Sequence, residues 1–201
     1  MKLFHDSASF FLHLLLLAGL FVRSSSRPVN TSLCSVFASV IPHLEKLLNS
    51  SKKLHDVSEE EVAVLSTMEH RLDTLPQIEH TASHFGSMKV NESLSQLYVD
   101  TQSFKHHVDW LKTAKHNHSL PSQSAEGTST HLLHISNLIK TSLKQVSAEV
   151  PELVAPSLPV VPTAFDVLRI SVELSERLRV FGNWSKRLLK SFQRQSRCPR
   201  H

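Results

Sequence analysis

The sequence predicts an all-α fold, a long-chain four-helix bundle with up-up-down-down topology and two long crossover connections. Two observations predict it. Four stretches carry apolar residues at steps of three and four, as amphipathic helices do, and no stretch shows the sustained alternation of a strand. The connections between these stretches are long, short and long, and a long connection lets consecutive helices run parallel.

The first 26 residues are predicted to be a signal peptide and are set apart from the fold. Lys2 precedes an apolar run over 10–22, and Ser24, Ser25 and Ser26 offer small residues for cleavage near Ser26. The run is too short for a comfortable membrane span, and no later run is long enough. We therefore expect a secreted, extracellular, soluble protein without membrane insertion, whose single four-helix domain covers 27–201.

The first helix is expected at about 31–54. Pro42 lies inside its apolar pattern, so it either kinks the helix or marks its true start. Residues 55–87 then form a connection that is long enough to cross the bundle. Within it, a capping box of Ser58 with Glu61 predicts a short helix. The apolar positions of the first helix are Leu33, Val36, Phe37, Val40, Ile41, Leu44, Leu47 and Leu48.

The second and third helices are expected at about 88–115 and 129–149. Apolar residues from Val90 to Leu111 form one stripe, and those from Leu132 to Val146 form another. The segment between them, 116–128, is polar and includes a proline and a glycine, so it is expected to be an ordinary loop.

A proline-rich linker over 150–163 leads to the fourth helix, expected at 164–194. The linker contains four prolines and no glycine, so it should run extended, near polyproline II. At about 3.1 Å per residue it reaches roughly 43 Å, whereas a helix of about 25 residues is roughly 37 Å long. The linker can therefore cross the whole bundle. Its prolines are Pro151, Pro156, Pro159 and Pro162.

The two cysteines, Cys34 and Cys198, lie at opposite ends of the predicted mature chain. In the expected topology the start of the first helix and the end of the fourth lie at the same end of the bundle, so a disulfide is expected between them. Free or intermolecular thiols are the alternative. Five N-glycosylation sequons begin at Asn30, Asn49, Asn91, Asn117 and Asn183.

Charge and motifs exclude several functions. Without Lys2, Arg23 and Asp6, the predicted mature chain has 20 basic and 17 acidic residues, so its net charge of +3 does not imply nucleic acid. The 14 histidines include no metal-binding spacing, and no nucleophile or phosphate-loop motif occurs. We expect no enzyme, no cofactor and no metal site.

Positive charge concentrates near the end of the sequence. One interpretation is a solvated helix face whose cations suit a helix C-terminus. The other is contact with a glycosaminoglycan or another acidic partner. The residues are Lys186, Arg187, Lys190, Arg194, Arg197 and Arg200.

Three segments and the proline-rich linker closely resemble the interleukin-11 family. The segments are 72–76 (LDTLP), 103–111 (SFKHHVDWL) and 183–189 (NWSKRLL). The resemblance covers approximately 60–195 and is weakest in the first helix. The sequons and the cysteine pair depart from the mammalian pattern and indicate a divergent vertebrate form.

The resemblance implies a secreted cytokine and growth factor. Such a protein binds a specific α receptor and then recruits the shared signal-transducing β receptor, which activates JAK/STAT signalling. Three surfaces are implied. One joins the end of the fourth helix to the late first crossover, a second uses exposed faces of the first and third helices, and a third lies at the start of the fourth helix.

Four residues are assigned roles by the resemblance. Asn183, Trp184 and Arg187 match the α-receptor surface, and Phe165 aligns with a tryptophan that anchors the signalling receptor. Helical register places Arg187 outside the apolar stripe and Trp184 at its boundary, so Trp184 is an interface anchor or a core-edge aromatic. Phe165 is an anchor or a buried staple. A glycan on Asn183 would block this surface, so we expect Asn183 to be unmodified in active protein.

Other surface residues are assigned less sharply. Trp110 either packs under the first crossover or is exposed. The second receptor surface offers polar positions such as Lys46, Lys140 and Lys144. Two other functions are considered, namely a helical cytokine of the same class with a different α receptor, and a secreted carrier that holds an apolar ligand in the bundle core.

Overall fold

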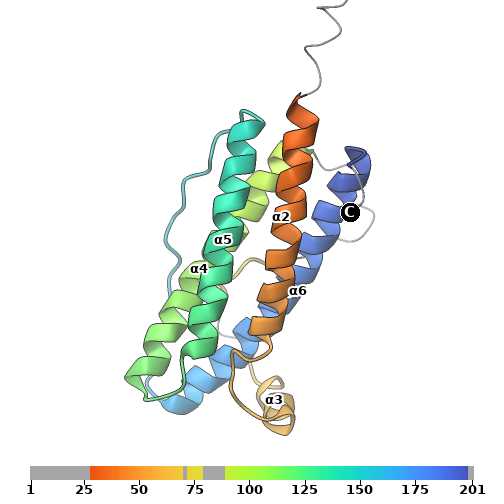
Figure 1. The fold of residues 1–201 in the computed structure, drawn as a ribbon. Coiled ribbons are helices and arrows are strands. Elements are labelled where there is room, and N and C mark those ends of the chain that lie inside the picture. The colour runs from red at the N-terminus through yellow and green to blue at the C-terminus, as the bar shows by residue number, and fades with distance from the viewer. Residues whose placement is uncertain (1–27, 70–71, 79–88, 199–201) are drawn as a thin grey trace, which may run out of the picture.

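Four long helices form a bundle in which consecutive pairs run parallel. The computed structural model describes residues 28–69, 72–78 and 89–198, with side chains from residue 33 onward. The predicted signal peptide therefore lies outside the described residues. In Figure 1, α2 and α4 run downward, whereas α5 and α6 run upward. The helices are α2 (Pro28–Ser51), α3 (Glu59–Leu65), α4 (Val90–Asn117), α5 (Gln123–Gln145) and α6 (Ala164–Gln195).

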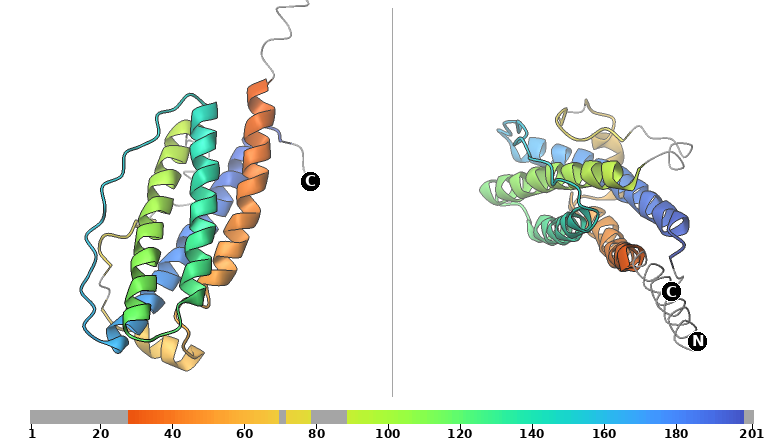
Figure 2. Two further views of the ribbon diagram at one scale, coloured as in Figure 1. Left: turned by 60° about the vertical axis from the view of Figure 1, so that its left-hand side comes forward. Right: turned by 90° about the horizontal axis from the view of Figure 1, so that it is seen from above.

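The all-α prediction is confirmed, and no strand occurs among the described residues. α2 packs against α5 and α6, and α4 packs against the same two helices, so each parallel pair lies on a diagonal of the bundle. Figure 2 shows this arrangement from the side and along the bundle. Within the described part of the chain, no helix combines the length and the apolar character needed to cross a membrane.

The core runs along the whole bundle axis. The Phe104 and Phe181 rings pack with centroids 4.8 Å apart, and those of Phe37 and Phe192 lie 6.1 Å apart. All four side chains are fully buried. Leu, Ile and Val side chains from all four long helices fill the space between these aromatics, as the apolar stripes of the sequence predict.

α2 continues through Pro42, so this proline does not mark the start of the helix. α2 and α6 approach each other closely where Gly182 of α6 faces Leu48 of α2. A Cβ atom at this position would lie 2.8 Å from Cδ2 of Leu48. The absence of a side chain therefore allows the two helices to pack at this distance.

α5 begins at Gln123, six residues before the expected start at 129, which corrects the prediction of a loop over 116–128. The polar residues that suggested a loop form helical contacts. The Thr128 hydroxyl donates to the Ser124 carbonyl at 2.7 Å, and Ala125 and Thr128 are fully buried. Hydroxyl groups that bond back to the preceding turn are compatible with a helix, so composition alone misplaced this boundary.

A buried lysine lies in the last turn of α4. Lys115 has no exposed surface, and its Nζ donates to the Leu54 carbonyl at 2.6 Å. The same Nζ forms an ion pair with Asp56 at 2.6 Å. A buried charge is tolerated only when it is paired and hydrogen-bonded, and here both partners come from the start of the first crossover. Lys115 thus fixes that crossover to α4.

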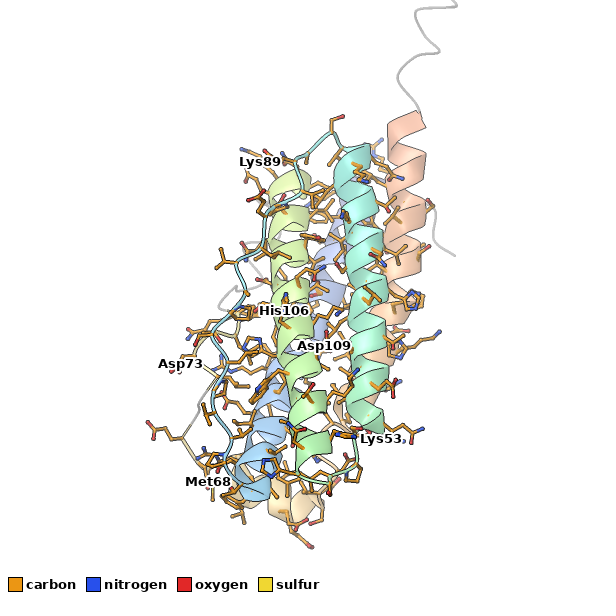
Figure 3. The ribbon with its side chains drawn as sticks, turned by 90° about the vertical axis from the view of Figure 1, so that its left-hand side faces the viewer. Lys53, Met68, Asp73, Lys89, His106 and Asp109 are labelled. Atoms are coloured by element: carbon orange, nitrogen blue, oxygen red, sulfur yellow. A yellow bond between two sulfur atoms is a disulfide. The ribbon has the colours of Figure 1, made fainter. Side chains whose placement is uncertain are left out.

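The proline-rich linker crosses the bundle as an extended chain alongside α4 (Figure 3). The first crossover, marked by Asp73, lies on the same side of α4. Two hydrogen bonds to the linker backbone hold it there. The Thr74 hydroxyl donates to the Ser157 carbonyl at 3.0 Å, and Nε2 of His118 lies 3.1 Å from the Val161 carbonyl.

Candidate functional site

The first turn of α6 presents Phe165 to solvent. Thr163 caps the helix, because its hydroxyl oxygen accepts from the Asp166 backbone N–H at 3.1 Å. The cap fixes the direction in which the chain leaves the linker, and Phe165 follows two residues later with 52% of its surface exposed. A buried staple would not leave half of a phenyl ring in water, so the arrangement favours the anchor interpretation.

Arg187 and Asn183 are exposed near the other end of α6. The Asn183 side-chain amide donates to the Arg179 carbonyl one turn earlier, at 2.9 Å. At about 1.5 Å per residue, Phe165 and Arg187 are roughly 33 Å apart along the helix axis. The two sets of predicted site residues on α6 are therefore two separate surfaces.

Trp184 lies in the core and is only 5% exposed. This is the core-edge alternative, and it leaves almost no indole surface for a partner to contact. α6 is flanked by both α2 and α4, and the Leu72 backbone N–H of the first crossover donates to Glu173 Oε1 at 3.2 Å. The buried arc of α6 is consequently wider than a single stripe, and it includes Trp184.

A shallow pocket of about 330 Å³ lies where the first crossover meets α6. Its wall on the crossover is formed by Pro76, Gln77 and Ile78, and its wall on α6 by Arg177 and Val180. Val180 is 49% exposed although it is apolar. The pocket therefore lies between the late part of the first crossover and α6. Its α6 residue Val180 is about two turns before Arg187. Sequence reasoning missed Val180. The signal that could have found it is an aliphatic residue at a position where the helical register of α6 predicts a polar, exposed side chain.

The pocket does not open into the bundle core. Its lining residues are on the surface, and the apolar stripes of α2, α4 and α5 contribute none of them. The core itself is filled by closely packed side chains. The geometry thus gives no support to the carrier interpretation, which requires an apolar cavity lined by those stripes.

A chain of hydrogen bonds joins α4, the first crossover and the linker. His107 Nδ1 lies 2.8 Å from the Ser103 carbonyl, and its Nε2 lies 2.9 Å from the Thr74 hydroxyl, which donates to Ser157. Burial lowers the pKa of His107, so the ring is neutral near pH 7. A neutral ring has one N–H, whereas donating to both oxygens requires the protonated form. While the ring is neutral, one of the three contacts (His107 with Ser103, His107 with Thr74, and Thr74 with Ser157) therefore has no proton between its two polar atoms.

Histidines of α2 and α5 lie together beside a lysine of α2. Lys46, Lys140 and Lys144, the positions suggested for a second receptor surface, are all exposed. Sequence reasoning missed three histidines, of which His43 and His131 lie near Lys46. The ring of His43 stacks on His134 with centroids 5.3 Å apart, and the His131 ring lies 6.5 Å from His43. Among the described residues no group of histidines, cysteines or carboxylates is arranged to hold a metal ion.

Trp110 is partly buried and packs against the core. The sequons at Asn49, Asn91, Asn117 and Asn183 are exposed, whereas the side chain of Asn30 lies outside the described set. Cys34 and Cys198 form a disulfide, with Cα atoms 5.5 Å apart. This bond joins the start of α2 to the residues that follow α6.

The family model that describes interleukin 11 matches residues 27–196. The chain belongs to the interleukin-11 family. The matched region includes the first helix, where the sequence resemblance is weakest, and it contains the whole bundle. No curated protein and no solved structure was found to match the chain.

Membership of the interleukin-11 family makes the protein a cytokine, and this is a family of signalling ligands rather than enzymes. The helical bundle agrees with that assignment. For a cytokine, the relevant parts of the structure are exposed surfaces, because its action is to bind receptors. The surfaces described above are those at the two ends of α6 and the exposed lysines of α2 and α5.

Proposed function

We propose that the protein is a secreted ligand that binds a specific α receptor and then recruits the shared signal-transducing β receptor, leading to JAK/STAT signalling. The main support is the position of two exposed surfaces on one rigid helix, with Phe165 at its start and Arg187 near its end. A separation of roughly 33 Å lets two receptors contact α6 without competing for the same residues.

The α-receptor surface is proposed to consist of Arg187, Asn183 and the pocket between Ile78 and Val180. An exposed guanidinium beside a half-exposed apolar rim is a common composition for an interface anchor. Trp184 then supports this surface from beneath instead of contacting the receptor. The proposal requires an unmodified Asn183, because a glycan there would cover Arg187.

The signalling-receptor surface is proposed to centre on Phe165. Burial of a half-exposed phenyl ring against a partner removes apolar surface from water, which contributes about 25 cal/mol per Å². The exposed residues Lys46 of α2 and Lys140 and Lys144 of α5 are proposed for the second contact with a signalling receptor. Secretion is supported by the apolar run over 10–22 that follows Lys2.

The two surfaces are tested by a crossed experiment with Arg187→Glu and Phe165→Ala. Arg187→Glu should weaken binding to the α-receptor ectodomain at least tenfold, or about 1.4 kcal/mol. Phe165→Ala should keep that affinity and lose STAT phosphorylation in responsive cells. Binding is measured by surface plasmon resonance, and mass spectrometry verifies that Asn183 carries no glycan.

Each matched control makes a similar kind of substitution at a different position. Lys140→Glu reverses an exposed charge on α5, and Val154→Ala truncates a linker side chain that is 93% exposed. Both controls should bind the α receptor as the wild type does. If Arg187→Glu and Phe165→Ala both bind and signal normally, the two assigned surfaces are wrong.

A further inference from the structure

Charge is strongly segregated along the sequence. All 18 acidic residues and 14 of the 22 basic residues precede Arg177, so residues 1–176 carry a net charge of −4. The remaining eight basic residues lie in 177–201, which therefore carries +8 without any acidic residue. A mildly basic protein thus has one strongly basic end.

Four of these cations form a row on the exposed face of α6 and a fifth follows the helix, and we call the five together the basic row. Its residues are Arg179, Arg187, Lys190, Arg194 and Arg197. At 100° per residue the first four lie within an arc of about 80°, and they extend over roughly 22 Å of the helix axis. Arg197 follows the end of the helix, next to the disulfide at Cys198. The disulfide fastens this end of the row to α2.

Internal pairing does not account for the basic row. The nearby Glu45 carboxylate is committed to Lys186, which lies 2.5 Å away and is not part of the row. Hydrogen bonding to Lys186 lowers the pKa of Glu45, so the carboxylate stays charged in that pair. Among the described residues, no carboxylate forms an ion pair with a residue of the row.

The helix dipole also accounts for only part of the row. Favourable interaction with the C-terminal end of a helix is limited to the last turn, which here contains Arg194. Arg179 and Arg187 lie two or more turns earlier and gain nothing from it. The like charges of the row repel one another, and an anionic partner would relieve that repulsion.

We propose that the basic row binds a linear sulfated polysaccharide of the glycosaminoglycan class. Four of the five residues are arginines, whose planar guanidinium groups donate two parallel hydrogen bonds to the oxygens of an anionic group. Four of the cations are spread along α6 and the fifth follows it, so the cations do not converge on one point. That arrangement suits a long polyanion with charges along its length, whereas a compact anion would contact one or two of them.

The experiment compares two triple variants with the same net charge. The row variant is Lys190→Gln, Arg194→Gln and Arg197→Gln, which leaves Arg187 in place. The control variant is Lys52→Gln, Lys140→Gln and Lys144→Gln, which removes three exposed lysines elsewhere. Affinity for a size-defined heparin oligosaccharide is measured by isothermal titration calorimetry at several salt concentrations, and circular dichroism checks that each variant is folded.

The row variant should bind heparin about tenfold more weakly than the wild type, whereas the control variant should change affinity by less than about twofold. Wild-type affinity should fall steeply with salt, because exposed ion pairs are screened. Equal losses in the two variants would show that only net charge matters and would overturn the proposal. Equally tight binding of polyglutamate, an acidic peptide, would overturn the assignment to a sulfated polysaccharide.

Discussion

At the scale of single residues, His43, His131 and His134 form a basic cluster with Lys46 on the face of α2 and α5. Burial, followed by the charges of His134 and Lys46, lowers the pKa of His43. Burial is also the main cause of the lowered pKa of His131, with further contributions from His43, Lys46 and His134. The folded protein therefore favours the neutral form of both rings.

This cluster should make the protein less stable in acid. Histidine in an unfolded chain has a pKa of about 6.5, above the folded values of His43 and His131, so the unfolded state binds more protons below that pH. The free energy of unfolding should fall as the pH drops from 7.5 to 5.0. His43→Gln should make this fall smaller, as measured by urea denaturation at both pH values.

His106→Gln serves as the matched control, because His106 is an exposed histidine on α4. It should show the same loss of stability on acidification as the wild type. A loss that is equally large in His43→Gln would show that the cluster does not govern the acid response.

Arg187 and Trp184 show what helical register can and cannot predict. Register alone predicted that Arg187 is exposed, because it lies far from the centre of the apolar stripe. Trp184 lies nearer the edge of the apolar stripe, where burial of a side chain depends on how many elements surround the helix. That number is a property of the packed bundle, so the burial of Trp184 followed only from the structure.

At the scale of elements, the linker is held to the bundle as well as being stiff. Thr74 is the central link, because it contacts His107 of α4 and the Ser157 carbonyl of the linker. The two long connections of the fold therefore meet at one hydroxyl group. Because the linker leads directly into α6, this contact also helps to position the start of α6 and Phe165.

Thr74→Val should lower the free energy of unfolding by about 1–2 kcal/mol, since it removes the hydroxyl partner of two polar groups. Chemical denaturation monitored by circular dichroism measures the change. Thr113→Val is the control, because the Thr113 hydroxyl is exposed and bonds only to the Asp109 carbonyl of its own helix. The control should cost less than about 0.5 kcal/mol. Equal costs would mean that the bridge to the linker adds no stability.

The helices were predictable to different degrees. α6 was expected at 164–194 and spans Ala164–Gln195, because a proline-rich linker precedes a strongly amphipathic stretch. The start of α5 was wrong, because serine, threonine and glycine suggested a loop at positions where hydroxyl groups bond back to the helix. Lys115 could not be placed from sequence, since lysine is rarely buried and its partners lie in another segment.

At the scale of the whole molecule, the disulfide determines how firmly the two ends of the chain are held. Cys34 and Cys198 are separated by 164 residues, so the bond restricts a very long loop of the unfolded chain. In the chain-entropy account, such a restriction contributes stability that increases slowly with loop length. Free thiols would leave the start of α2 and the end of α6 joined by packing alone.

Cys34→Ser combined with Cys198→Ser should lower the free energy of unfolding by about 2–5 kcal/mol. Urea denaturation under non-reducing conditions measures this change, and the wild type with added reductant provides the comparison. The reduced wild type should resemble the double variant. A double variant as stable as the oxidised wild type would show that the bundle does not depend on this bond.

The same bond has a consequence for the order in which the molecule is made. A growing chain emerges from its amino end, so Cys34 appears early and its partner follows 164 residues later. α2 therefore has to wait until α3, α4, α5 and α6 have been added before its covalent link can form. A chain that stops short of residue 198 keeps Cys34 as a free thiol, which chemically distinguishes an unfinished product from a complete one.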